Sequence, residues 1–247
     1  MRKSIILTLA CLAPLVTACQ GQAKDGAPKL RVLLTYGGHD FQQKEFFAMW
    51  DAMPGVTYTK APLPESAGLL KPGLEKNYDV IVMYDMVKAI TPEQRKAFAA
   101  LLEKGIGVVA LHHNLGAHAD WPEYRTIIGG KFLNAPETID GRSYPTSTWE
   151  HGQDLHITVA DTAHPITRGL SDYDIHDEAY GGVYVDPKAH VLLKTNHPKN
   201  VEPVAWTTRF GNSKVVYIMG GHDSAAWSNP SYQTLLRQSI GWVAQGQ

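Results

Sequence analysis

Nearly continuous apolar runs alternate with amphipathic stretches in the first half of the chain. Three such runs, at 30–36, 78–84 and 107–111, are typical of strands buried on both faces. Apolar residues recur at helical spacing over 41–53 and again over 91–104, where Thr-Pro-Glu-Gln supplies an N-cap and a first turn. This order predicts an α/β, flavodoxin-like, doubly wound and mostly parallel sheet with helices on both faces.

The second half of the chain has a less regular pattern. Four further strands are expected, at 155–159, 190–194, 204–208 and 214–219. A short helix is expected at 124–128 and an amphipathic one over 231–243. No linker composition interrupts residues 30–244, so we interpret them as one domain.

The first residues have the pattern of a targeting segment. Arg2 and Lys3 precede an apolar stretch over 5–16, whose length of about 12 residues is too short for a membrane-spanning helix. The Val-Thr-Ala-Cys sequence that ends at Cys19 resembles the lipobox of bacterial lipoproteins. An ordinary signal peptide with an incidental Cys19 is the alternative.

The lipobox resemblance implies a division of the chain and a location. Residues 1–18 would be a cleaved signal peptide, Cys19 the lipidated residue and 19–29 a tether to the folded domain. The protein would be lipid-anchored to a membrane of the bacterial cell envelope, on its periplasmic face. Gln20, rather than an aspartate, follows the cysteine and favours the outer membrane.

Composition and cysteine usage exclude several classes of function. The 247 residues are 44% hydrophobic with a net charge of −1, which argues against a broad face for nucleic acid. The two cysteines are Cys11 and Cys19, both near the N-terminus. The predicted domain therefore contains no disulfide, no thiolate metal site and no cysteine nucleophile.

Histidines follow three of the expected strands, at the point where each strand ends. His39 follows the first strand in Gly-Gly-His-Asp, His112 and His113 follow the third, and His222 follows the last in a second Gly-Gly-His-Asp. The carboxyl ends of parallel strands meet at one edge of a sheet, so we expect His39, His113 and His222 to line one pocket. The sequence therefore predicts a ligand site at this edge.

Two questions about this site stay open at the sequence level. His39, His113 and His222 are candidate ligands of a divalent metal such as zinc, although no His-Glu-x-x-His spacing occurs. A metal-free sugar site is at least as well supported. Asp177 and Glu178, with Tyr180 close by, are either a carboxylate pair for acid–base work or an exposed loop.

Several motifs, in this order and spacing, resemble the ThuA-like, or trehalose-utilisation, family over residues 30–244. The segments that carry the resemblance are 37–41, 107–114, 121–124, 128–132, 164–170, 177–180, 203–206 and 221–223. The resemblance implies a fold similar to class I glutamine amidotransferases. The elbow that holds a cysteine nucleophile in those enzymes reads Leu-His-His-Asn here, so glutaminase chemistry is excluded whatever the fold.

The resemblance further implies a role in the catabolism of disaccharides or 3-keto-glycosides, as a hydrolase, lyase or isomerase. Imidazole can abstract a proton beside a carbonyl, so His113 and His222 are the candidate base and acid, with Asp223 or Asp40 orienting a ring. The candidate substrate-binding residues are His39, Asp40, His112, Trp121, Glu178 and Tyr180. A non-catalytic sugar-binding envelope lipoprotein is the alternative.

No Gly-x-Gly-x-x-Gly nicotinamide fingerprint occurs in the sequence. We therefore expect the protein to leave oxidation of the sugar to a separate sugar dehydrogenase. The expected small-molecule partner is a carbohydrate.

Overall fold

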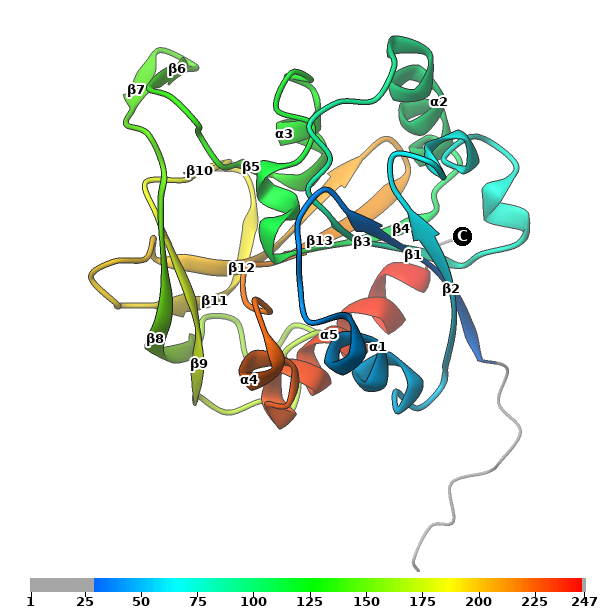
Figure 1. The fold of residues 1–247 in the computed structure, drawn as a ribbon. Helices are drawn as coiled ribbons and strands as arrows, with labels where there is room; N and C mark the ends of the chain where they lie inside the picture. Colours follow the sequence, from blue (N-terminus) through cyan, green and yellow to red (C-terminus); the bar gives the residue numbers. More distant parts are fainter. Residues whose placement is uncertain (1–28, 246–247) are drawn as a thin grey trace, which may run out of the picture.

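A nine-stranded sheet forms the centre of the molecule in the computed structural model, which describes residues 29–245 (Figure 1). Five strands pair in parallel, in the order β2-β1-β3-β4-β13. These strands are β2 (Val56–Pro62), β1 (Leu30–Gly37), β3 (Val80–Asp85), β4 (Gly107–Leu111) and β13 (Ser213–Ile218). Their order has the flavodoxin-like pattern, with a topological switch point between β1 and β3.

Four antiparallel strands extend the same sheet beyond β13. They are β12 (Pro203–Phe210), β11 (His190–Thr195), β8 (Thr148–Val159) and β9 (Tyr173–Gly181), in this order. The strand β9 was not predicted, and β8 begins seven residues before its predicted start. The parallel edge strand β2 was not predicted either, because Val56–Pro62 mixes exposed polar residues with a proline.

Helices cover both faces of the sheet, as the sequence predicts (Figure 1). α2 (Pro92–Leu102) and α3 (Tyr124–Ile128) lie on one face, and α1 (Gln43–Asp51) and α5 (Pro230–Ala244) on the other. Thr91 forms a capping box with Gln94 at the predicted start of α2. The remaining short elements are α4 (Ser224–Trp227), η1 (Ala67–Leu69), η2 (Leu74–Lys76), η3 (His112–Gly116), β5 (Gly130–Lys131), β6 (Glu137–Ile139), β7 (Arg142–Tyr144) and β10 (Tyr184–Val185).

A β-bulge interrupts the pairing of β8 with β9. Glu150 lies opposite Ala179, but Gln153 lies opposite Asp177, so β8 carries one extra residue in this interval. Gly152 lies within it at φ 65°, a left-handed conformation that glycine adopts without strain. The bulge lies beside the pocket described below.

The predicted signal peptide and tether fall almost entirely on residues 1–28, outside the described part of the chain. Among residues 29–245, no helix has both the length and the apolar character needed to cross a bilayer.

Candidate functional site

A pocket opens at the carboxyl edge of the parallel strands, at the border with the antiparallel half of the sheet. Its empty volume of about 860 Å³, which includes space open to solvent, is in the range typical of small-molecule sites. The lining residues are His39, Asp40, Met86, His113, Gly116, Phe132, Asn134, Trp149, His151, Glu178, Tyr180 and His222. The structure thus brings His39, His113 and His222 into one pocket, as their positions after parallel strands predict.

The adjacent His112 and His113 both reach this region because the chain leaves the strand at once. β4 ends at Leu111, and His112 takes a left-handed conformation with φ 47° at the start of η3. The hydroxyl of Tyr217 donates a hydrogen bond to the His112 carbonyl (2.6 Å). In a continuing strand the two side chains would point to opposite faces; in this turn both serve the site.

His112 lies at the centre of a buried polar cluster behind the pocket. Its Nδ1–H donates to the Met219 carbonyl (2.8 Å), so its Nε2 faces the other members. That Nε2 atom is 3.1 Å from Glu178 Oε2, 3.1 Å from His222 Nδ1 and 3.2 Å from the Tyr180 hydroxyl. Four groups from β4, β9 and β13 or the turns after them therefore converge on one point.

The groups of this cluster shift one another's pKa values. Burial on its own would lower the pKa of His112, but the hydrogen bond to Glu178 and the charges of Asp177 and Glu178 raise it overall. Burial likewise opposes ionisation of Glu178, yet His112, His222 and His151 together lower the pKa of this carboxyl. Burial, followed by the positive charge on His112, lowers the pKa of His222 to about 4. Glu178 is therefore held ionised and His222 neutral at neutral pH.

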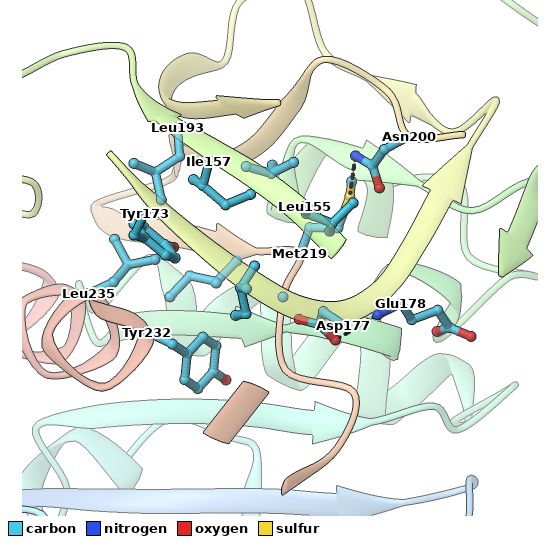
Figure 2. Close-up of a pocket in the computed structure, with 14 residues that line it drawn as sticks. Leu155, Ile157, Tyr173, Asp177, Glu178, Leu193, Asn200, Met219, Tyr232 and Leu235 are labelled. Carbon is cyan, nitrogen blue, oxygen red and sulfur yellow. Dashed lines mark hydrogen bonds between the residues drawn. The ribbon is translucent and has the colours of Figure 1, made fainter. Parts of the chain in front are cut away.

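The neighbouring Asp177 has a different role, because consecutive residues of a strand point to opposite faces. Its carboxylate accepts hydrogen bonds from the backbone N–H groups of Gly221 (2.7 Å) and His222 (3.0 Å). Figure 2 shows Asp177 beside a second, mainly apolar cavity, with Glu178 extending away from it. Of the two predicted carboxylates, Glu178 enters the pocket and Asp177 fixes the turn that carries His222.

His113 also lines the pocket, but it differs from Glu178 in being uncharged. It is 4% exposed, and its ring stacks on that of His39 with centroids 4.8 Å apart. Burial and the charges that His112 and His39 can carry hold the pKa of His113 well below its usual range. Its Nε2–H donates to the Tyr84 carbonyl (3.1 Å), which leaves Nδ1 as a proton acceptor. His113 is therefore a neutral imidazole at neutral pH.

Two of the predicted site residues take structural positions. The Asp223 carboxylate accepts from the backbone N–H of Ala225 (2.9 Å) and caps α4, so it does not orient an imidazole through a hydrogen bond. Trp121 is 7% exposed and packs edge-on against Phe98, with a tilted contact to Tyr124. It does not line the pocket, which corrects its interpretation as a sugar-stacking group.

The tryptophan that does line the pocket is Trp149, which the sequence analysis did not single out. Its side chain is 58% exposed, and its ring lies 4.8 Å from that of His151. His151 in turn contacts Glu178 Oε1 through Nδ1 (3.0 Å). A Trp two residues before a His in a strand places both on one face, and this spacing was the available signal.

The donor atoms that lie closest together differ from the predicted metal set. Within residues 29–245, His112, Glu178 and His222 form a group of side chains able to hold a metal ion. Of the predicted ligands His39, His113 and His222, this group retains His222 alone. Asp40, Glu178, Tyr180 and His39 line the pocket, whereas His112 lies behind it.

The fold and pocket define a class of α/β proteins with a histidine-rich site at the carboxyl edge of a flavodoxin-like sheet. The ThuA family, described as trehalose utilisation, matches residues 32–243. The chain therefore belongs to the ThuA family, and this membership supports a carbohydrate-related role. A comparison with curated protein sequences gave no match.

Solved structures with the same fold include two ThuA-like proteins. One from Parabacteroides merdae has a TM-score of 0.73 at 18% identity and covers 89% of this chain and 91% of its own. One from Bacteroides uniformis has a TM-score of 0.67 at 20% identity and covers 90% and 94%. A cytoplasmic protein from Salmonella typhimurium LT2 has a TM-score of 0.61 at 12% identity and covers 87% and 99%.

Proposed function

We propose that this protein is an enzyme that acts on a disaccharide or keto-glycoside by acid–base chemistry, with His113 as the base. Membership of a trehalose-utilisation family supports a sugar as the substrate. The observation that carries the proposal is the buried, neutral imidazole of His113 in an open pocket that the ionised carboxylate of Glu178 also lines. A group of this kind is in its unprotonated form at neutral pH, as a general base must be before it takes a proton.

The step that suits this geometry is removal of a proton from the carbon next to a ketone. The C–H electron pair moves into the adjacent C–C bond, the carbonyl becomes an enolate, and the proton goes to Nδ1 of His113. His222 also lines the pocket, and its imidazole N–H can donate a hydrogen bond to the enolate oxygen. The protonated His113 then returns the proton, either to carbon in an isomerase or to a departing glycosidic oxygen in a lyase.

Trp149 supplies the second element that a sugar site needs. Its exposed indole lies at the pocket, where an aromatic face can stack on the C–H face of a sugar ring. His39 and Asp40 add polar groups at the same opening. Trp149 on β8 thus provides binding, and His113 after β4 provides the chemistry, in the same pocket.

The deciding assay measures turnover of a panel of 3-keto-disaccharides and their unoxidised parents. We expect turnover of keto sugars by the wild type, and loss of turnover in His113→Ala with little change in affinity, since the base acts mainly in the transition state. The matched control is His156→Ala, which removes an exposed histidine outside the pocket. Absence of turnover with sugar binding intact would instead identify a non-catalytic sugar-binding protein.

We also propose that the protein is anchored in the cell envelope by lipidation of Cys19. The basic Arg2 and Lys3, the apolar stretch and the lipobox-like sequence support this. Mass spectrometry should find acyl chains on Cys19, and Cys19→Ala should move the protein from the detergent phase to the soluble periplasmic fraction. Unmodified wild-type protein in the soluble periplasm would refute the anchor.

A further inference from the structure

Three side-chain atoms, two of them from residues that line the pocket, form a closed triangle. His112 Nε2 is 3.1 Å from Glu178 Oε2 and 3.1 Å from His222 Nδ1, and the last two atoms are 3.5 Å apart. A tetrahedral zinc ion with ligands at about 2.0–2.1 Å separates neighbouring ligand atoms by about 3.3–3.4 Å. The three atoms thus already have nearly the spacing of one face of such a coordination sphere.

A cation satisfies this triangle better than a proton does. A hydrogen on His112 Nε2 points along one direction, so it cannot give straight hydrogen bonds to both Glu178 and His222. A metal ion among the three atoms accepts a lone pair from each at once. The carboxylate also supplies the negative charge that balances the cation in a buried site.

Contacts from behind hold each of these residues in place, as is usual for metal ligands. The Nδ1–H of His112 donates to the Met219 carbonyl (2.8 Å), which fixes the tautomer with Nε2 free to bind. Glu178 Oε1 is held by Nδ1 of His151 (3.0 Å), which leaves Oε2 for the ion. The backbone N–H of His222 donates to the buried Asp177 carboxylate (3.0 Å).

We propose that His112, Glu178 and His222 bind one divalent transition-metal ion, with its remaining position open to the pocket. Two imidazoles and one carboxylate are a donor set used by zinc and by non-haem iron sites that keep positions for substrate. Glu178 and His222 also line the pocket, so an oxygen of a bound sugar can reach the ion. Only the role of the ion in turnover rests on the proposed function; its binding does not.

The test is metal binding by the purified full chain after treatment with a chelator. Titration with Zn²⁺ in a calorimeter should give one equivalent, and Co²⁺ should give visible d–d absorption that Zn²⁺ abolishes. Glu178→Gln and His222→Ala should each weaken binding by about 100-fold or more, because loss of even an outer-shell partner typically costs 10–100-fold. His156→Ala is the matched control, since His156 also pairs with a carboxylate, Asp174 (2.7 Å), on the surface.

Two results would overturn the site. One is a wild type that does not bind one equivalent of Zn²⁺. The other is a variant, Glu178→Gln or His222→Ala, that is folded by circular dichroism and binds Zn²⁺ as tightly as the wild type. Failure of the proposed function looks different. Stoichiometric Zn²⁺ binding without turnover of any keto sugar would refute the enzyme and support the site, whereas turnover by a protein that binds no Zn²⁺ would do the reverse.

Discussion

Two sets of histidines in this protein differ in burial and in the groups around them. On the outer strands, His156, His176 and His190 are each more than half exposed, and each pairs with one aspartate at 2.7–2.8 Å. At the pocket, His112 and His113 are both buried; burial and the charge on His112 lower the pKa of His113, whereas Glu178 and Asp177 raise that of His112. Burial and convergence, rather than a carboxylate neighbour, separate a reactive imidazole from an ordinary one.

The largest expected difference between the sets is in catalysis. His113→Ala should lower kcat for a keto-disaccharide by about 100-fold or more, the usual size of a general-base contribution. His176→Ala removes an imidazole that also contacts a carboxylate, Asp154, and should leave kcat unchanged. Steady-state kinetics of the two variants would check this, and an equal loss in both would erase the distinction.

A smaller effect, on KM, is expected from replacing Trp149 at the pocket. Trp149→Ala should raise KM for a sugar by about 3- to 10-fold with little change in kcat, because a ring contact contributes roughly 0.5–1.5 kcal/mol. Leu69→Ala is the control, since Leu69 is the other exposed large hydrophobic residue among residues 29–245 and does not line the pocket. An unchanged KM in Trp149→Ala would show that the sugar does not use this ring.

The smallest effect concerns the outer set and depends on pH. The hydrogen bond to Asp154 raises the pKa of His176 in the folded protein. The stabilisation is therefore complete below the unfolded pKa of about 6.5 and is lost as pH rises through the higher folded pKa. Urea unfolding should show His176→Ala to be less stable than the wild type near pH 5 and equal to it near pH 9. A difference independent of pH would contradict the assignment.

The parallel half of the sheet was predictable because its strands are buried on both faces. Val32, Val82 and Val109 are fully buried, and such positions produce the continuous apolar runs that mark β1, β3 and β4. Helix starts were equally clear, since the capping residues of α2 are local in sequence. With the strand directions known, the convergence of the three histidine turns followed from geometry.

The part of the site that comes from the antiparallel half of the sheet could not be predicted from the sequence. The middle of β9 contains the charged residues Asp177 and Glu178, and in the sequence such residues suggest an exposed loop. In the structure both are buried in the strand. Their burial is compensated by partners more than 40 residues away, such as His112 and the turn at Gly221, which no local pattern reveals. The same holds for Trp121 and Trp149, because only the tertiary structure decides which indole is packed and which lines the pocket.

The bulge at Gly152 has a consequence for how the chain can vary. In a strand, alternate side chains share a face, so without the extra residue Trp149 and His151 would share one with Leu155 and Ile157. The inserted residue changes which side chains of β8 share a face. Trp149 and His151 line the pocket, whereas Leu155 and Ile157 line the apolar cavity of Figure 2. Deleting Gly152 would force β8 to keep either its core or its ligand-facing side chains, so strand length here is constrained as tightly as side-chain chemistry.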